Sequence, residues 1–289
     1  MDYLILAFAA LLLGSNFAFN KLYQQSYGNT PRAAFFFNAL LGASTAAIFF
    51  AINGFKADFT VYSFTMAGLM SLCVMSCNVM SFTILKMSGS IAIYTLYLMT
   101  GSMVLPYVWG LAFLGEPFSI LRTIGLLLIM SGVILTNFSK GKANIKLIAM
   151  CAAVFILNGG TNIISKMHQT ETVRNCVDSL DFVILGGIFK FILAGILFLI
   201  FPQKERKKSS QPIYKALLMI IISAIISGIS YFLQLSGAKH LPATILYPFI
   251  TGGSIIFSAL TGIIVFKERL SAKLAASILL CFCGTLLFL

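Results

Sequence analysis

Long runs of apolar residues, separated by short polar or charged segments, make up almost the whole chain. No charged residue occurs in residues 91–115 or 216–238. A helix needs about 20 apolar residues to cross roughly 30 Å of hydrocarbon. The pattern therefore predicts an all-α integral membrane protein with ten transmembrane helices, over residues 3–20, 32–53, 61–85, 90–114, 120–138, 145–165, 180–201, 214–237, 243–266 and 271–289.

The composition indicates that lipid, not water, surrounds the chain. Of its 289 residues, 59% are hydrophobic and 10% are charged, whereas soluble domains average about 25% charged residues. The first apolar run has only Asp2 before it and no basic segment, so we interpret it as a span and not as a signal peptide. We expect a multi-pass protein of the inner or plasma membrane. A monomer is compatible with the sequence, which leaves the oligomeric state open.

The net charge of +12 does not indicate a nucleic-acid partner. Basic residues occur singly or in short groups between the apolar runs, as they do in membrane-protein loops. Of the six cysteines, five lie inside predicted spans, no C-x-x-C pair occurs, and only two histidines are present. We therefore expect no disulfide, no metal site and no cofactor. The expected partners are the lipid bilayer and a small-molecule substrate.

The chain contains an internal repeat. Residues 86–135 align with residues 239–287 at an offset of 153, which becomes 152 after a slip of one residue. The aligned positions include Tyr94 with Tyr247, Gly101-Ser102 with Gly253-Ser254, Glu116 with Glu268 and Gly132 with Gly284, and Gly14-Ser15-Asn16 also matches Gly160-Thr161-Asn162. We predict two repeats of five helices, over residues 1–140 and 141–289. An odd number of spans inverts one repeat relative to the other, and such transporters bind substrate near the midplane between the repeats.

Three short motifs resemble those of a known transporter family. Residues 11–22 (LLLGSNFAFNKL) resemble its first-span signature, and residues 113–119 (FLGEPFS) and 266–271 (FKERLS) resemble the acidic signature after its fourth and ninth spans. On these motifs the chain resembles the EamA-type members of the drug/metabolite transporter superfamily. The resemblance implies a ten-span secondary carrier or exporter of small metabolites. Amino acids, sugar derivatives and nucleotide-sugar relatives are all substrates within that superfamily.

Lys190 is the most unusual residue of the apolar runs, because it lies in the middle of the predicted seventh span. A charged side chain there costs roughly 2.5–3.5 kcal/mol on insertion scales, so it should face protein or water. At an offset of 152 it aligns with Asn38, which would place both near a central cavity. Its function would be to bind a carboxylate or phosphate, or to titrate during transport. The structural alternative is that its ammonium extends to an interface or pairs with backbone carbonyls.

Other polar side chains within the spans are candidates for substrate contact. Asn16 and Asn162 are repeat mates, and the eighth span carries polar residues at three- and four-residue spacing, which share one helix face. The alternative for each is structural, namely hydrogen bonding between helices or, for the tyrosines, aromatic packing or an interfacial position. The predicted substrate-binding residues are Lys190, Asn38, Asn16, Asn162, Asn78, Tyr94, Tyr231, Gln234, Ser227 and Tyr247.

None of the eight acidic residues lies well inside a predicted span. Glu116 and Glu268 lie at span ends, where we expect them to cap the following helix or to pair with bases such as Arg122 and Lys267. A cavity with Lys190 and no carboxylate favours anions or zwitterions over lipophilic cations. The sequence therefore predicts a secondary transporter, an exporter or facilitator, of small polar metabolites such as amino acids or related organic anions, working by alternating access.

Two other classes of function remain as alternatives. A membrane-embedded lipid-modifying enzyme would need paired carboxylates, histidines or a metal cluster. His168 and His240 lie in different predicted loops, so we expect no enzymatic activity. A channel is the second alternative, and it would conduct without saturation.

Basic residues are unequally divided between the two sets of alternate loops, with 14 in one set and 5 in the other. Positive charge accumulates on the cytoplasmic side of membrane proteins. The charge distribution therefore predicts that both termini lie outside, whereas the family resemblance implies that both lie inside. Both orientations stay open at this point.

Overall fold

Ten α-helices make up most of the computed structural model, which describes residues 2–27, 30–88, 91–137, 145–201, 213–267 and 269–289. Within these ranges the chain contains no strand, so the predicted all-α fold class is confirmed. Nine of the helices are long and apolar enough to cross a membrane. The helices are α1 (Asp2–Tyr27), α2 (Pro31–Ile52), α3 (Val61–Ser88), α4 (Ile91–Phe113), α5 (Ile120–Asn137), α6 (Ile145–Thr170), α7 (Ser179–Ile200), α8 (Ile213–His240), α9 (Ala243–Phe266) and α10 (Ala272–Leu286).

The C-terminal ends of α1 and α6 differ most from the prediction. α1 continues to Tyr27, beyond the predicted end at residue 20, and α6 continues to Thr170, beyond the predicted end at residue 165. α10 has 15 residues, which is about 22 Å at 1.5 Å per residue and less than the roughly 30 Å of hydrocarbon. The charged loop predicted over residues 202–212 lies outside the described ranges.

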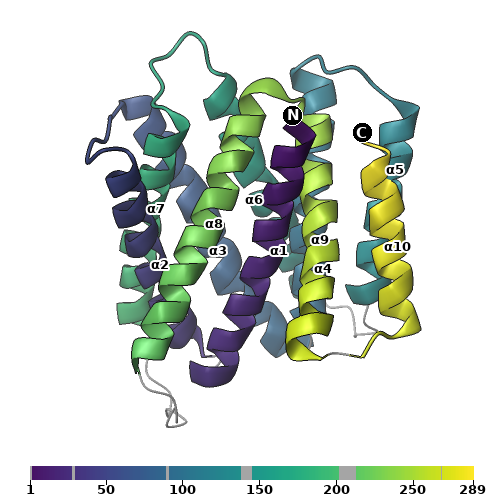
Figure 1. Cartoon of the computed structure of the whole chain (residues 1–289), viewed down its shortest axis with the longest axis horizontal. Coiled ribbons are helices and arrows are strands. Elements are labelled where there is room, and N and C mark those ends of the chain that lie inside the picture. The colour runs from purple at the N-terminus through teal and green to yellow at the C-terminus, as the bar shows by residue number, and fades with distance from the viewer. Residues whose placement is uncertain (1, 28–29, 89–90, 138–144, 202–212, 268) are drawn as a thin grey trace.

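The helices stand side by side, and both termini lie at the same end of the bundle (Figure 1). α2, α3, α7 and α8 form one side, α4, α5, α9 and α10 form the other, and α1 and α6 lie between them. The helix contacts of the first half are repeated in the second half. α1 packs on α8 and α9, and its counterpart α6 packs on α3 and α4. The counterparts α2 and α7 pack on each other, and so do α5 and α10. Inverted five-helix repeats produce this symmetry. The predicted repeat boundary at residue 140 lies outside the described ranges.

Glycines bring α2 and α7 into close contact. A Cβ built on Gly42 would lie 2.7 Å from the carbonyl oxygen of Gly187, and one built on Gly187 would lie 2.9 Å from the carbonyl oxygen of Gly42. Each glycine therefore lets the backbone of the other helix approach. α2 and α7 have 22 residues each, and their first residues, Pro31 and Ser179, lie 148 positions apart. In this register Lys190 lies opposite Gly42, so the predicted alignment of Lys190 with Asn38 is wrong.

The predicted offset of 152 applies to α5 and α10. Ser277 of α10 donates a hydrogen bond to the carbonyl oxygen of Gly132 at 2.8 Å. The offset of 152 exchanges this contact with the one between Gly125 and Gly284, and those two glycines also lie in close contact. This offset does not extend to α2 and α7, because residues 201–212 separate α7 from α8 whereas only residues 53–60 separate α2 from α3. A longer connection in the second half raises the offset of the helices that follow it.

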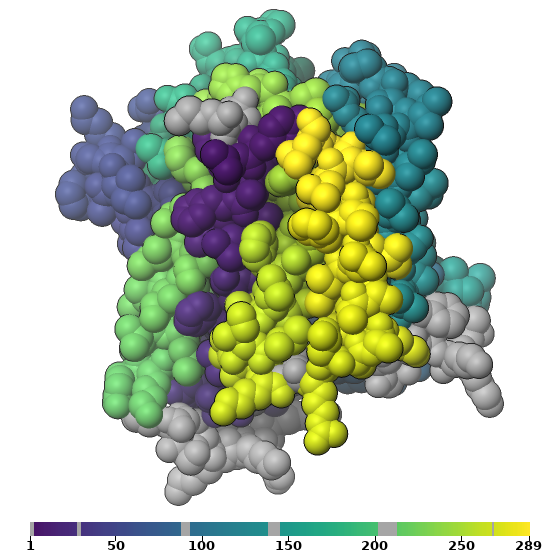
Figure 2. Space-filling view, turned by 45° about the vertical axis from the view of Figure 1, so that its right-hand side comes forward, coloured from purple at the N-terminus to yellow at the C-terminus, as the bar shows by residue number. Residues whose placement is uncertain are grey.

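Apolar side chains fill the bundle and also cover its outside. One core cluster lies among α1, α4, α5, α9 and α10 and includes Met103 and Ile129. Another lies among α2, α3, α7 and α8 and includes Phe182. On the outside, Leu4 is 77% exposed and Leu199 is 76% exposed. Figure 2 shows one such outer face, on which α1, α9 and α10 lie side by side. Outward apolar side chains suit a protein surrounded by lipid.

Candidate substrate cavity

A cavity of about 130 Å³ lies inside the bundle between α2, α3, α7 and α8. Each molecule of liquid water occupies about 30 Å³, so the cavity has the space of roughly four waters. Helices from both halves of the chain form it, and its wall combines polar and apolar groups. The lining residues are Thr45, Met70, Ser71, Val74, Val183, Gly186, Gly187, Lys190, Ser227, Gly228 and Tyr231.

Lys190 supplies the charge in this wall. It lies near the middle of α7, about 15 Å from either end at 1.5 Å per residue, which is farther than a lysine side chain extends. Within the described part of the chain, no residue pairs with its ammonium group through a hydrogen bond or an ion pair. An ammonium carries three donor hydrogens. The cavity therefore presents an unpartnered cationic donor deep inside an apolar helix bundle.

Two hydroxyl groups of the wall, those of Thr45 and Ser227, donate their hydrogens within their own helices. Thr45 donates to the carbonyl oxygen of Leu41 at 2.8 Å, and Ser227 donates to the carbonyl oxygen of Ser223 at 2.6 Å. A hydroxyl oxygen retains acceptor lone pairs after its hydrogen is donated. The wall therefore offers acceptor oxygens on α2 and α8 beside the donor of Lys190 on α7.

Tyr231 is held in the wall by contacts with two other helices. Its hydroxyl oxygen lies 3.0 Å from Oγ of Ser165 on α6 and 2.9 Å from Sδ of Met70 on α3. A buried tyrosine hydroxyl normally has such a partner. These contacts fix the position of the ring, so Tyr231 shapes the cavity and joins α8 to α3 and α6.

The predicted asparagines of α1 and α6 join helices together. Asn16 accepts a hydrogen bond from Ser223 of α8, and Asn162 donates to the carbonyl oxygen of Ser102 on α4 at 2.8 Å. Tyr247 of α9 donates to the carbonyl oxygen of Asn162 at 2.6 Å. Polar contacts of this kind stabilise packing between transmembrane helices. These three predicted residues do not line the cavity.

The remaining predicted residues also lie apart from the cavity wall. Asn38 donates to a carbonyl oxygen one turn earlier in α2 at 2.8 Å, and Gln234 donates to Ser230 at 3.2 Å. Tyr94 belongs to an apolar cluster of α3, α4 and α6. Asn78 lies on α3 one turn beyond the cavity-lining part of that helix.

Of the ten predicted residues, the structure brings Lys190, Ser227 and Tyr231 to one cavity. Sequence reasoning missed Thr45 because a threonine in an apolar run has no distinctive chemistry. It also missed Gly186, although this glycine precedes Lys190 by four residues, a spacing that places both on one helix face.

Glu116 and Lys166 stabilise the junction of α8 and α9. The Glu116 carboxylate accepts hydrogen bonds from the backbone N–H groups of Ala243 at 2.6 Å and Thr244 at 2.8 Å, so it caps α9. The buried Lys166 donates to two carbonyl oxygens at the end of α8, each at 2.7 Å. A capping role for Glu116 was predicted, but for the following helix, and the capped helix belongs to the other half. Its repeat mate Glu268 lies outside the described residues.

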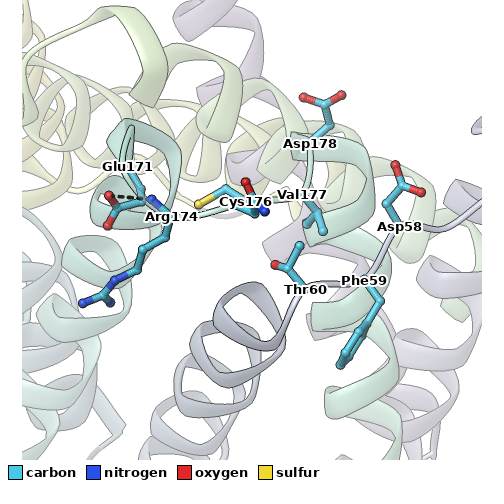
Figure 3. A pocket seen from close by; sticks show the side chains of 9 residues that line it. Asp58, Phe59, Thr60, Glu171, Arg174, Cys176, Val177 and Asp178 are labelled. Carbon is cyan, nitrogen blue, oxygen red and sulfur yellow. Dashed lines mark hydrogen bonds between the residues drawn. The ribbon is translucent and has the colours of Figure 1, made fainter.

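A larger hollow of about 610 Å³ lies between two connections at the end of the bundle that carries the termini. Figure 3 shows Glu171 and Arg174 on one side of it and Asp58 and Asp178 on the other. The backbone N–H of Val173, with those of its neighbours, holds the pKa of Glu171 below its ordinary value. The other three charged side chains are exposed. Solvated charges at a surface are less informative than Lys190, so the inner cavity is the candidate site.

The fold and the cavity together define a multi-pass membrane protein with an inner cavity lined by helices from both of its halves. Residues 145–289 match the model of the EamA-like transporter family, so the chain belongs to this family of membrane transporters. The resemblance seen in its motifs is confirmed. A solved structure described only as "Crystal structure of protein" has a TM-score of 0.76 at 18% identity, over 99% of this chain and 95% of that chain. This likeness shows the fold alone. No curated protein matches the chain.

Proposed function

We propose that this transporter carries small zwitterions or organic anions, such as amino acids, and that Lys190 binds their carboxylate. The observation that carries the proposal is the unpartnered ammonium of Lys190 in the wall of a cavity inside the bundle. Family membership gives a membrane transporter. The chemistry of the cavity wall supports the class of substrate.

A bound carboxylate would offset the cost of the buried ammonium. A lysine at the centre of a membrane helix costs roughly 2.5–3.5 kcal/mol on insertion scales, and a charge-assisted hydrogen bond to a carboxylate is about twice as strong as a neutral one. No acidic side chain is among the described residues that line the cavity. A cationic substrate would therefore meet a like charge with nothing to balance it.

The hydroxyl oxygens of the wall suit the other end of a zwitterion. Thr45 and Ser227 have already donated their hydrogens, so their oxygens can accept hydrogen bonds from an amino group. An α-amino acid has a carboxylate for Lys190 and an ammonium for these oxygens. This complementarity favours amino acids over simple anions.

The symmetry of the bundle supports alternating access as the mechanism. Two helices of each half surround the cavity, and the close contact between α2 and α7 lies beside it. In transporters built from inverted repeats, one repeat moves relative to the other around a fixed site. The proposed motion would connect this cavity first to one end of the bundle and then to the other.

Uptake into proteoliposomes tests the role of Lys190. Lys190→Met keeps the length of the side chain and removes its charge, while Lys56→Met removes the charge of an exposed loop lysine. We expect Lys190→Met to weaken the binding of amino acids about 10- to 100-fold, since hydrogen bonds to charged groups contribute about 1.5–3 kcal/mol and 1.4 kcal/mol is tenfold. Lys56→Met should behave as the wild type.

The same measurement can reject the proposal. A wild-type protein that transports a lipophilic cation, with Lys190→Met transporting it equally well, would contradict both the substrate class and the role of Lys190. The folded yield of each variant, measured by size-exclusion chromatography in detergent, separates a loss of binding from a loss of structure.

A further inference from the structure

Two adjacent glycines of the cavity wall, Gly186 and Gly187, differ in what surrounds them. A Cβ built on Gly187 would lie 2.9 Å from the backbone nitrogen of Ala46 and 2.9 Å from the carbonyl oxygen of Gly42. A Cβ built on Gly186 would meet a single atom within 4 Å, Cε of Met70, at an ordinary contact distance of 3.5 Å. Gly187 is therefore required by the contact with α2, whereas helix packing does not require Gly186.

The missing side chain of Gly186 leaves space inside the cavity. Met70 lines the same cavity from α3, so a Cβ on Gly186 would lie at the cavity wall, in contact with Cε of Met70. A glycine within a helix costs about 1 kcal/mol relative to alanine. A glycine that packing does not require, at the wall of a ligand-sized space, keeps that space open.

The cavity is small enough for a single methyl group to matter. Its volume of about 130 Å³ equals roughly four waters, and a methyl group is about the size of one water. Gly186 precedes Lys190 by four residues on α7, and side chains at this spacing lie about 5–6 Å apart. A ligand whose carboxylate meets Lys190 would therefore extend its side chain toward Gly186 within a few bonds.

We propose that Gly186 determines substrate specificity by setting the longest side chain that the cavity accepts. The inference rests on the proposed function, because it uses the carboxylate at Lys190 as the fixed end of the ligand. The substrates it assigns are the smallest aliphatic amino acids. In Gly186→Ala the added methyl group would occupy the space that the last methylene of the longest accepted substrate side chain needs.

A homologous series of straight-chain amino acids tests this assignment. Alanine, 2-aminobutyrate, norvaline and norleucine, which differ by single methylenes, would compete with a labelled substrate in proteoliposomes. The proteins are the wild type, Gly186→Ala and the control Gly195→Ala, a substitution on the same helix that meets no atom within 4 Å. We expect Gly186→Ala to lose about tenfold or more in affinity for the longest acid that the wild type accepts, because one methylene is worth 10- to 200-fold. The affinity for alanine should change far less.

The outcomes separate this inference from the proposed function. If the wild type binds the series through Lys190 but Gly186→Ala has the same length limit, the role of Gly186 is overturned and the proposed function stands. An equal loss for every acid in Gly186→Ala would also overturn it, since a size limit acts on long side chains alone. If Lys190→Met binds the series as the wild type does, the proposed function fails. Val74→Ala, which enlarges the opposite wall, should move the limit toward longer acids.

Discussion

Two lysines within the helices of this bundle have different surroundings. Lys166 donates to the carbonyl oxygens of Ala238 and Leu241, which satisfy its charge at the end of α8. Lys190 lines a cavity without a hydrogen-bond partner among the described residues. A cation at the C-terminal end of a helix is stabilised by the helix dipole, so Lys166 has a structural explanation. The environment of the ammonium, and not its presence in a helix, identifies Lys190 as the candidate for substrate binding.

The cap that Glu116 places on α9 predicts a loss of stability on substitution. Glu116→Ala removes the acceptor of two backbone hydrogen bonds, and hydrogen bonds to charged groups contribute about 1.5–3 kcal/mol. We expect a lower midpoint of thermal unfolding in detergent. Asp58→Ala, which removes an exposed carboxylate of the α2–α3 connection, is the control and should lower the midpoint less. Equal midpoints for the two variants would contradict the capping role.

At the scale of the element, the contact between α2 and α7 depends on glycines from both helices. Gly42 and Gly187 let the two backbones approach more closely than any side chain allows, as small residues do between membrane helices. The same close approach brings Thr45 of α2 and Lys190 of α7 into the wall of one cavity.

This contact predicts the effect of a single methyl group on stability. Gly187→Ala would place a Cβ 2.9 Å from backbone atoms of α2, and overpacking of this kind costs about 1–3 kcal/mol. We expect a lower midpoint of thermal unfolding and no equivalent loss in Gly195→Ala, whose new Cβ meets nothing within 4 Å. A wild-type midpoint for Gly187→Ala would show that α2 and α7 are not held this closely.

At the scale of the whole molecule, both termini lie at the same end of the bundle as the connection between α6 and α7. The loops of the opposite end carry most of the basic residues of the sequence. The positive-inside rule then places that opposite end in the cytoplasm. The family resemblance implies the reverse orientation, with the termini in the cytoplasm. Cys176, in the connection between α6 and α7, can therefore report which side of the membrane this end of the bundle faces.

Cys176 is the one cysteine among the described residues that lies outside a helix, and the charge rule predicts that it faces outward. A membrane-impermeant maleimide should label it in intact cells and should not label Cys176→Ser. Burial and then the nearby Glu171 raise the pKa of the Cys176 thiol, so less thiolate is present at neutral pH and the labelling rate should increase toward alkaline pH. Labelling that requires permeabilised cells would place the termini inside.

Much of the candidate site could not be read from the sequence, because identical side-chain chemistry serves different purposes in a helix bundle. Asn16 and Asn162 have the polarity of binding residues, but they join helices. Thr45 and Gly186 have no distinctive chemistry, and they line the cavity because of where α2 and α7 meet. The sequence did identify Lys190, since the cost of a charge in an apolar run is visible without any tertiary contact.

The sequence by itself determined the ten helices, the repeat of five and the presence of a lysine in the middle of one span. These features follow from local patterns of apolar and charged residues, because lipid requires each span to satisfy its own backbone. The tertiary structure alone decided the close contact between Gly42 of α2 and Gly187 of α7, the helix that Glu116 caps, and the residues that share a cavity with Lys190. Each of these depends on contacts between helices distant in the chain, which connection lengths and glycine packing set and which no local pattern contains.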